Sequence, residues 1–447
     1  MKHRFRIIVG MLLLAIPLCM NAQVKPVKDE SSKPGTKPKT EKAEVEKAKT
    51  EKAVKPEKKE KTIKTEKTEN SEKNVKVKKT EKAEKTVKVV KTEKGEKAEN
   101  GETLENTEKP KSGLEMPKIS GFVQGLYQAN LHHDGELIDN TFRMRRVRLS
   151  VDGNLSRTVS YKIQGDFINS PMLVDAYVKY KPCREFAIQV GQFKLPFTLE
   201  NPINPVNLEI FDYGESVQNL VGYSEVCGVG GLGRDIGVMA TGSLFPVFGG
   251  EGYKYSIVDY SIGVFNGNGP INFKKNEKGL DNNNRKDFVG RLEVHPGLKD
   301  LTLSGSFYYG KYYKDEENNG TRNRWSAGAQ YNDGKIVVRG EYIGGKTGYY
   351  NTVDPEFSLI ERHYFSNGYY VVAGYNLQAG EQKIMPVLRY EHFTKDNSIV
   401  DGGTNWYTTG INYWPLKSVN FKLDYSLIQK ELGDNSHRVV AILSYKF

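Results

Sequence analysis

The sequence lacks the features that would anchor it in a membrane as a helix or build a metal or catalytic centre. The chain has 447 residues, and after residue 22 no apolar run is long enough for a transmembrane helix. Its seven histidines and three cysteines show no spacing typical of metal ligands, so we predict no metal site and no cofactor. There is no Gly-x-Ser-x-Gly motif and no obvious acid/base pair, and we therefore expect no catalytic residues and no enzyme.

Aromatic residues are absent from 23–118, where Lys, Glu and Thr recur in units such as Thr50-Glu51-Lys52-Ala53. A segment of this composition cannot bury enough apolar surface to offset the entropy lost on ordering. We predict a disordered low-complexity tail. Two interpretations of its role stay open: a basic tether to an anionic partner such as peptidoglycan or lipid phosphate, and a solvated spacer.

The positive charge of the chain is concentrated outside its aromatic-rich part. Residues 23–118 contain 28 Lys against 20 Asp and Glu, whereas residues 119–447 contain 35 basic and 35 acidic residues. The isoelectric point near 9.1 therefore reports on the tail. We expect no nucleic-acid partner, because an exported protein would not meet one.

The N-terminus has the pattern of an export signal. Lys2, Arg4 and Arg6 precede an apolar run at 7–18, which is too short to cross a bilayer as a helix. Ala22 offers a small residue at a cleavage point before residue 23. We predict a signal peptide over 1–22.

The other end of the chain alternates between apolar and polar residues up to the last position. Apolar or aromatic side chains occupy every second place, at Val439, Ala441, Leu443, Tyr445 and Phe447. Alternate residues of a strand face opposite sides, so this pattern predicts a final strand with one apolar face. It is typical of an outer-membrane barrel, whose last strand pairs with its first and faces lipid. The alternative is an edge strand of a soluble β-sandwich.

Strand-like runs recur throughout 119–447, which we assign to one barrel domain. Short turns alternate with longer polar loops, and this alternation is typical of an outer-membrane barrel with both termini in the periplasm. Tyrosine and tryptophan near the strand ends, as in Trp406-Tyr407 and Tyr413-Trp414, predict aromatic girdles at the lipid interface. We predict an all-β fold, an antiparallel transmembrane β-barrel of about 16 strands in the bacterial outer membrane. The expected strands are 119–131, 141–153, 158–169, 173–181, 186–194, 234–245, 254–266, 286–295, 300–311, 322–332, 335–345, 367–378, 382–395, 403–414, 418–430 and 437–447.

Two cysteines remain after the signal, and the topology separates them. Cys183 falls in a short turn and Cys227 in the third long loop, with the strand 186–194 between them. Such a strand spans roughly 25–30 Å, whereas a disulfide needs Cα atoms within about 7 Å. We predict two free thiols.

The third long loop, 195–233, is the candidate constriction. Long loops without regular structure are usually functional. This loop contains five carboxylates and no Lys or Arg: Glu200, Glu209, Asp212, Glu215 and Glu225. Cations must therefore come from the barrel wall, where Arg-x-Glu recurs on one strand face. These pairs predict either a transverse field that orients polar solutes or neighbouring charges that neutralise one another. The candidate pore-lining residues are Arg146, Arg148, Lys194, Arg234, Arg291, Glu293, Arg339, Glu341, Arg389 and Glu391.

Several blocks within 119–240 resemble the phosphate-selective porin O and P family. They are Arg145-Arg146-Val147-Arg148-Leu149, Asp175-Ala176-Tyr177-Val178, the run Gly191 to Glu200, and Gly233-Arg234-Asp235-Ile236-Gly237. The resemblance implies a sixteen-stranded homotrimeric porin whose third loop folds into the pore, and in the founding members a basic pore for phosphate. The acidic loop of this chain departs from that pattern.

We therefore expect an outer-membrane porin that lets small hydrophilic solutes and ions diffuse passively, with phosphate or other anions implied only by the resemblance. Outer-membrane lipid is an expected partner. Two alternatives remain: a structural protein that joins the outer membrane to peptidoglycan through its tail, and a barrel hydrolase. Because the barrel is neutral overall, we expect weak ion selectivity, with cations slightly favoured.

Overall fold

The computed structural model describes residues 116–168, 172–250, 252–270, 284–298, 300–313, 319–351 and 360–447. The predicted signal peptide and almost all of the predicted tail lie outside these residues. Among the helices of the described part, none has the length and apolar character needed to cross a membrane.

Antiparallel strands make up nearly all regular structure in the described part of the chain. The long connection between the fifth and sixth strands holds a short 3-10 helix, η1 (Pro205–Asn207), and α2 (Glu215–Val221). The strands are β1 (Lys118–His132), β2 (Leu137–Asn154), β3 (Val159–Asp166), β4 (Met172–Tyr180), β5 (Ala187–Lys194), β6 (Arg234–Gly249), β7 (Gly252–Phe265), β8 (Asp287–Val294), β9 (Leu301–Tyr313), β10 (Asn319–Asn332), β11 (Ile336–Asn351), β12 (Ile360–Tyr375), β13 (Leu377–Ala379), β14 (Gln382–Thr394), β15 (Gly403–Leu416), β16 (Val419–Lys430) and β17 (Ser436–Lys446).

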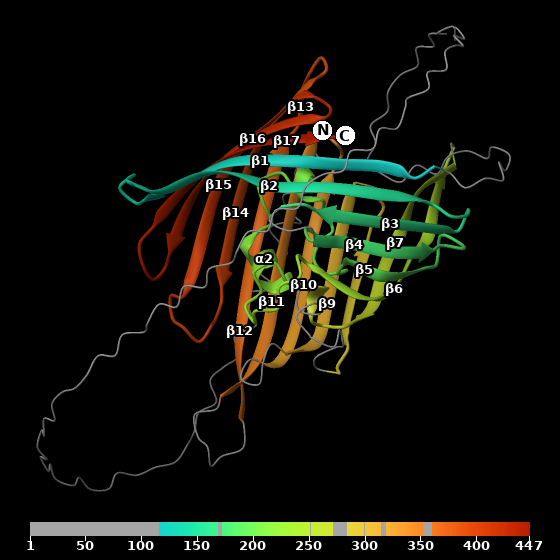
Figure 1. Cartoon of the computed structure of the whole chain (residues 1–447), viewed down its shortest axis with the longest axis horizontal. Coiled ribbons are helices and arrows are strands. Elements are labelled where there is room, and N and C mark those ends of the chain that lie inside the picture. The colour runs from blue at the N-terminus through green and yellow to red at the C-terminus, as the bar shows by residue number, and fades with distance from the viewer. Residues whose placement is uncertain are drawn as a thin grey trace, which may run out of the picture. The chain divides into compact units, whose positions relative to one another are not determined.

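These segments close into a sixteen-stranded barrel. Apart from β12 and β13, each strand pairs with the next along the chain, and β1 pairs with both β2 and β17. The segments β12 and β13 count as one strand of the barrel, interrupted at Asn376, because both pair with β14. In Figure 1 α2 lies within the ring of strands, next to β11, β12 and β14. The prediction of an antiparallel β-barrel of about 16 strands is confirmed.

The last residue of the chain takes part in closure. Phe447 and Gly121 exchange two backbone hydrogen bonds of 2.9 and 3.1 Å, which continue the β1–β17 ladder. Gly121 is needed there, because a Cβ atom would lie 2.6 Å from the Phe447 ring and 2.5 Å from the carbonyl oxygen of Arg148. Pairing the first strand with the last leaves no open sheet edge to face lipid.

The two faces of each strand differ as a membrane barrel requires. On β2 the side chains of Arg146 and Arg148 are each 5% exposed, whereas the adjacent Leu149 is 38% exposed. A bulge at Arg145 reverses the alternation, so that Phe142 and Met144, at 82% and 48% exposure, also face outward. Polar groups thus turn inward and apolar groups outward, because lipid offers no hydrogen bonds to a polar side chain.

Short turns have the residues their geometry needs. Gly334, with φ +83°, sits in the turn from β10 to β11, where most side chains would be strained. Burial would raise the pKa of the Asp333 carboxylate, but the hydrogen bonds that it accepts from the backbone N–H groups of Ile336 and Lys335 together outweigh burial and lower the pKa. The strands β6 and β7 extend beyond the predicted limits and leave only residues 250–251 between them.

The predicted aromatic girdles hold only in part. Tyr407, Tyr425 and Tyr445 are 43–50% exposed on the outer face. Trp406 and Trp414, however, turn into the barrel, where the Arg438 guanidinium and the Lys383 ammonium lie over their rings. The prediction was wrong for both tryptophans, because each shares a strand with a neighbouring tyrosine and only one of two adjacent side chains can face lipid.

Cys183 and Cys227 are both free, as predicted, the first exposed and the second buried. Burial, with the nearby charge of Glu225, raises the pKa of the Cys227 thiol to about 12. Because a thiolate is the reactive form, we expect a maleimide to label one cysteine per folded chain lacking residues 1–22, and two after unfolding. Intact-mass spectrometry measures this, and labelling of both cysteines in the folded protein would contradict the burial of Cys227.

Candidate constriction site

The loop 195–233 fills part of the barrel interior and packs against its wall through apolar side chains. Phe197 and Val217 are fully buried, and Leu220 is 1% exposed. The apolar wall residues that contact the loop were not among the predicted site residues. Their signal was present, because some strands carry apolar residues on both faces. The wall residues are Phe265, Val289, Val337, Ile343, Val372, Met385 and Val387.

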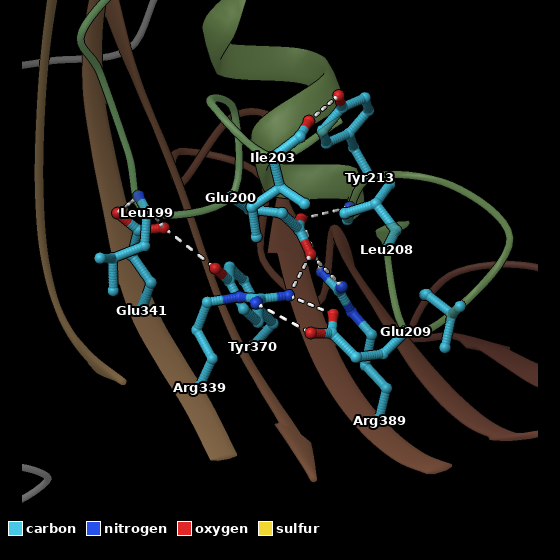
Figure 2. A network of polar contacts seen from close by, with 12 residues as sticks. Leu199, Glu200, Ile203, Leu208, Glu209, Tyr213, Arg339, Glu341, Tyr370 and Arg389 are labelled. Atoms are coloured by element: carbon cyan, nitrogen blue, oxygen red, sulfur yellow. Dashed lines mark hydrogen bonds and ion pairs between the residues drawn. The ribbon is translucent and has the colours of Figure 1, made fainter. Parts of the chain in front are cut away.

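Glu200 is the central anchor of the loop. Its carboxylate is completely buried and lies between two wall arginines (Figure 2). Arg389 Nη1 is 2.6 Å and Arg339 Nη2 3.3 Å from Glu200 Oε1. The second oxygen, Oε2, accepts a hydrogen bond of 2.8 Å from the backbone N–H of Gly214. One loop carboxylate thus joins β11, β14 and the start of α2.

The same guanidinium of Arg339 binds a second loop carboxylate. Its Nη2, which also contacts Glu200, is 2.6 Å from Glu209 Oε2 (Figure 2). Burial would raise the pKa of Glu209, but Arg339 outweighs burial and holds it below its usual value. Nearby, Asn412 donates to the Glu209 carbonyl oxygen at 2.7 Å, and the Lys422 ammonium donates to the Leu208 carbonyl.

Asp212 connects the loop to another part of the barrel wall, at β2. Its carboxylate pairs with Arg145 and with Arg146, the latter at 3.0 Å. Burial alone would raise the pKa of Asp212, yet the two guanidinium groups lower it. Farther along the loop, Glu225 pairs with Arg324 of β10 at 2.8 Å. Neither Arg145 nor Arg324 was among the predicted site residues.

Wall carboxylates bind the loop backbone in turn. Glu341 accepts hydrogen bonds of 2.9 and 3.0 Å from the Leu199 N–H, and one of 3.1 Å from the Tyr370 hydroxyl. Glu391 accepts one of 2.7 Å from the N–H of Glu215. Desolvated backbone donors need such partners, so these wall carboxylates also hold the loop in place.

The recurring Arg-x-Glu pattern has two outcomes. Arg291 and Glu293 pair at 3.5 Å, and Arg389 and Glu391 at 2.7 Å. By contrast, Arg339 pairs with the loop carboxylates and Glu341 binds the loop backbone. The partners of Arg339 and Glu341 therefore come from the loop, and the residue pattern of the strand does not predict them.

Arg146, Arg148, Lys194 and Arg234 gather near the base of the loop, where their charges act on one another. Arg148 pairs with Asp166 at 2.9 Å and Arg234 with Asp175 at 2.7 Å, while Arg146 pairs with Asp212. Lys194 donates to two loop carbonyl oxygens at 2.6 Å and to the Tyr213 hydroxyl at 2.8 Å. This basic cluster is thus largely neutralised by aspartates.

Glu215 differs from the other four loop carboxylates. Its side chain accepts a hydrogen bond of 3.2 Å from the Asn219 amide, and among the described residues no Lys or Arg lies within ion-pair distance. Burial and the nearby charge of Glu391 raise its pKa to about 7, with Arg438 and Asn219 opposing. The other four carboxylates neutralise arginines of the wall.

As for metals, the described residues contain no group of three or more His, Cys, Asp or Glu able to hold an ion.

A closed sixteen-stranded barrel that holds its third long loop inside defines an outer-membrane porin. The chain belongs to the phosphate-selective porin O and P family, whose model matches residues 118–444. It is therefore a channel protein of the bacterial outer membrane.

Solved porins share the fold at low identity. An anion-selective porin from Comamonas acidovorans is 13% identical, with a TM-score of 0.52 over 74% of this chain and 99% of that one. The outer-membrane channel DcaP of Acinetobacter baumannii is 13% identical, with a TM-score of 0.50 over 76% and 99%. OmpF of Salmonella typhi, in complex with daunomycin, is 11% identical, with a TM-score of 0.51 over 74% and 97%. No curated protein matches this chain.

Proposed function

We propose that this porin is a weakly selective pore through which small hydrophilic solutes and ions diffuse passively. The observation that carries the proposal is the pairing of loop acids with wall arginines: Glu200, Glu209, Asp212 and Glu225 are all bound in this way. A phosphate filter needs cationic donors that are free to replace the hydration of the anion. Guanidinium groups already bound to carboxylates offer few free donors.

The family resemblance favours a second candidate, a phosphate or general anion pore. The cluster of Arg146, Arg148, Lys194 and Arg234 supports it, because the ammonium of Lys194 donates to three neutral oxygens in the described part of the chain. We propose these four residues, with Arg291, Glu293, Arg339, Glu341, Arg389 and Glu391, as the lining of the pore, and loop 195–233 as its constriction.

A reversal-potential measurement on purified protein in a planar bilayer tests the proposal. In a salt gradient we expect a permeability ratio of chloride to potassium within roughly threefold of unity, because paired charges leave little net field. Phosphate added to a chloride solution should leave the current nearly unchanged. Block by sub-millimolar phosphate that disappears in Arg146→Ala plus Arg148→Ala would instead establish the phosphate pore.

We further propose a homotrimer, as the family resemblance implies, with the tail in the periplasm. Tethering to peptidoglycan through the tail is the alternative main role, and single-channel recording separates the two. An open pore of nanosiemens size supports diffusion, whereas a barrel that never conducts supports tethering.

A further inference from the structure

Arg438 of β17 is held differently from the wall arginines described above. Its guanidinium lies between two aromatic rings, 4.5 Å from the centroid of Phe211 and 4.7 Å from that of Trp406. Its buried Nε has no hydrogen-bond partner, and no carboxylate in the described part of the chain lies within ion-pair distance. Contact with two aromatic rings keeps the cation in place without neutralising its charge.

Glu215 and Glu391 lie beside this guanidinium. Both line a small cavity together with Arg438 and Trp406, and its volume of about 10 Å³ leaves space for roughly one water molecule. Glu391 is committed to other partners, because it pairs with Arg389 and accepts the N–H of Glu215. Within the described residues, the Asn219 amide is the only hydrogen-bond partner of the Glu215 carboxylate.

Every other charge that faces this cavity region belongs to an established pair or lies farther off. From the loop, Asp212 is held by Arg145 and Arg146, and Tyr213 lines the cavity as a neutral phenol. From β14, Arg389 is held by Glu200 and Glu391. From β16, Asp424 forms no ion pair in the described part of the chain, but it lies outside the cavity lining and acts on Arg438 less than Glu215 does. Of the four charged residues that line the cavity, Arg389 and Glu391 pair with each other, and Arg438 and Glu215 have no direct ionic partner in the described part of the chain.

We propose that Glu215 and Arg438 form a pH-dependent charge selector in the pore. With Glu215 protonated, Arg438 loses the carboxylate that acts on it most strongly, its positive charge beside the constriction loop is less compensated, and anions are favoured. With Glu215 ionised, the two charges cancel and the preference for anions falls. The near-neutral pKa of Glu215 supports this, because its protonation then changes across the range in which bacteria live. The inference rests on the proposed function, since it requires that the barrel conducts.

The test is reversal potential in a potassium chloride gradient between about pH 5.5 and about pH 8.5, which bracket the titration. For the unsubstituted protein we expect the chloride-to-potassium permeability ratio to fall roughly two- to threefold as pH rises. Glu215→Gln should fix the ratio near its low-pH value at every pH. Arg438→Gln should shift the ratio toward potassium throughout.

Two further variants keep the result interpretable. Arg143→Gln removes the same charge from an exposed arginine of β2 that donates to Gln128 at 3.2 Å, and it should keep the full pH dependence. Arg438→Lys retains the charge and should retain the pH dependence. It serves as the second variant if Arg438→Gln fails to fold. A pH dependence unchanged in Glu215→Gln, or equal shifts in Arg143→Gln and Arg438→Gln, would overturn the selector. Absence of current at any pH would instead overturn the proposed function.

Discussion

Replacing Glu200 by Gln should loosen the constriction loop and make the pore distinctly anion-selective. The substitution keeps the shape of the side chain but leaves the guanidinium groups of Arg339 and Arg389 short of one negative charge. Both arginines are at most 4% exposed, and Glu200 is fully buried. Breaking a buried ion pair on one side costs about 3–5 kcal/mol, because a desolvated charge is left without compensation.

Two measurements check this expectation. The temperature at which the folded band on an unboiled gel converts to the unfolded band should fall, and the reversal potential should shift toward chloride. Glu381→Gln is the matched control, because Glu381 is an exposed residue in the short turn before β14 and loses the same charge. If the two variants have equal stability and equal selectivity, Glu200 does not anchor the loop.

Replacing Gly214 by Ala should displace the start of α2 from the wall. A Cβ atom at this position would overlap Nη2 of Arg389 and lie 2.5 Å from Oε2 of Glu391. Both atoms are fixed by hydrogen bonds to the loop or to each other, so the loop must move. Overpacking of this kind typically costs about 1–3 kcal/mol.

We expect a larger and noisier single-channel conductance in Gly214→Ala, since the displaced segment no longer holds one position in the barrel. Gly250→Ala is the control, because a Cβ atom at Gly250 meets nothing within 4 Å. A conductance trace of Gly214→Ala that matches the control in size and noise would show that the segment 214–215 does not limit the pore.

The strands and their closure followed from the sequence alone. The period of two in 437–447 placed Phe447 on a face that continues to the terminus, and Phe447 does pair with Gly121. Alternating short and long connections gave the antiparallel order, because a strand pairs with its neighbour along the chain. These are local properties, and each is repeated sixteen times in the barrel, so an error of a few residues at one strand end changes little.

The sequence also showed that the loop 195–233 is acidic and that Arg146 and Arg148 share an inward face. It could not show which acid meets which base. Glu200 is 139 residues from Arg339 and 189 from Arg389, and a loop without a period gives no register to connect them. The same limit concealed Arg324 and Arg438.

What the sequence determined was the architecture, because strand period, turn residues and loop lengths act over short distances along the chain. What only the tertiary structure decided was the electrostatics of the interior. Folding the loop inward turned five apparent free carboxylates into four bound ones and left Glu215 beside an arginine held by two aromatic rings. Charge compensation acts through space, so it depends on which surfaces meet and not on the order in which their residues are linked.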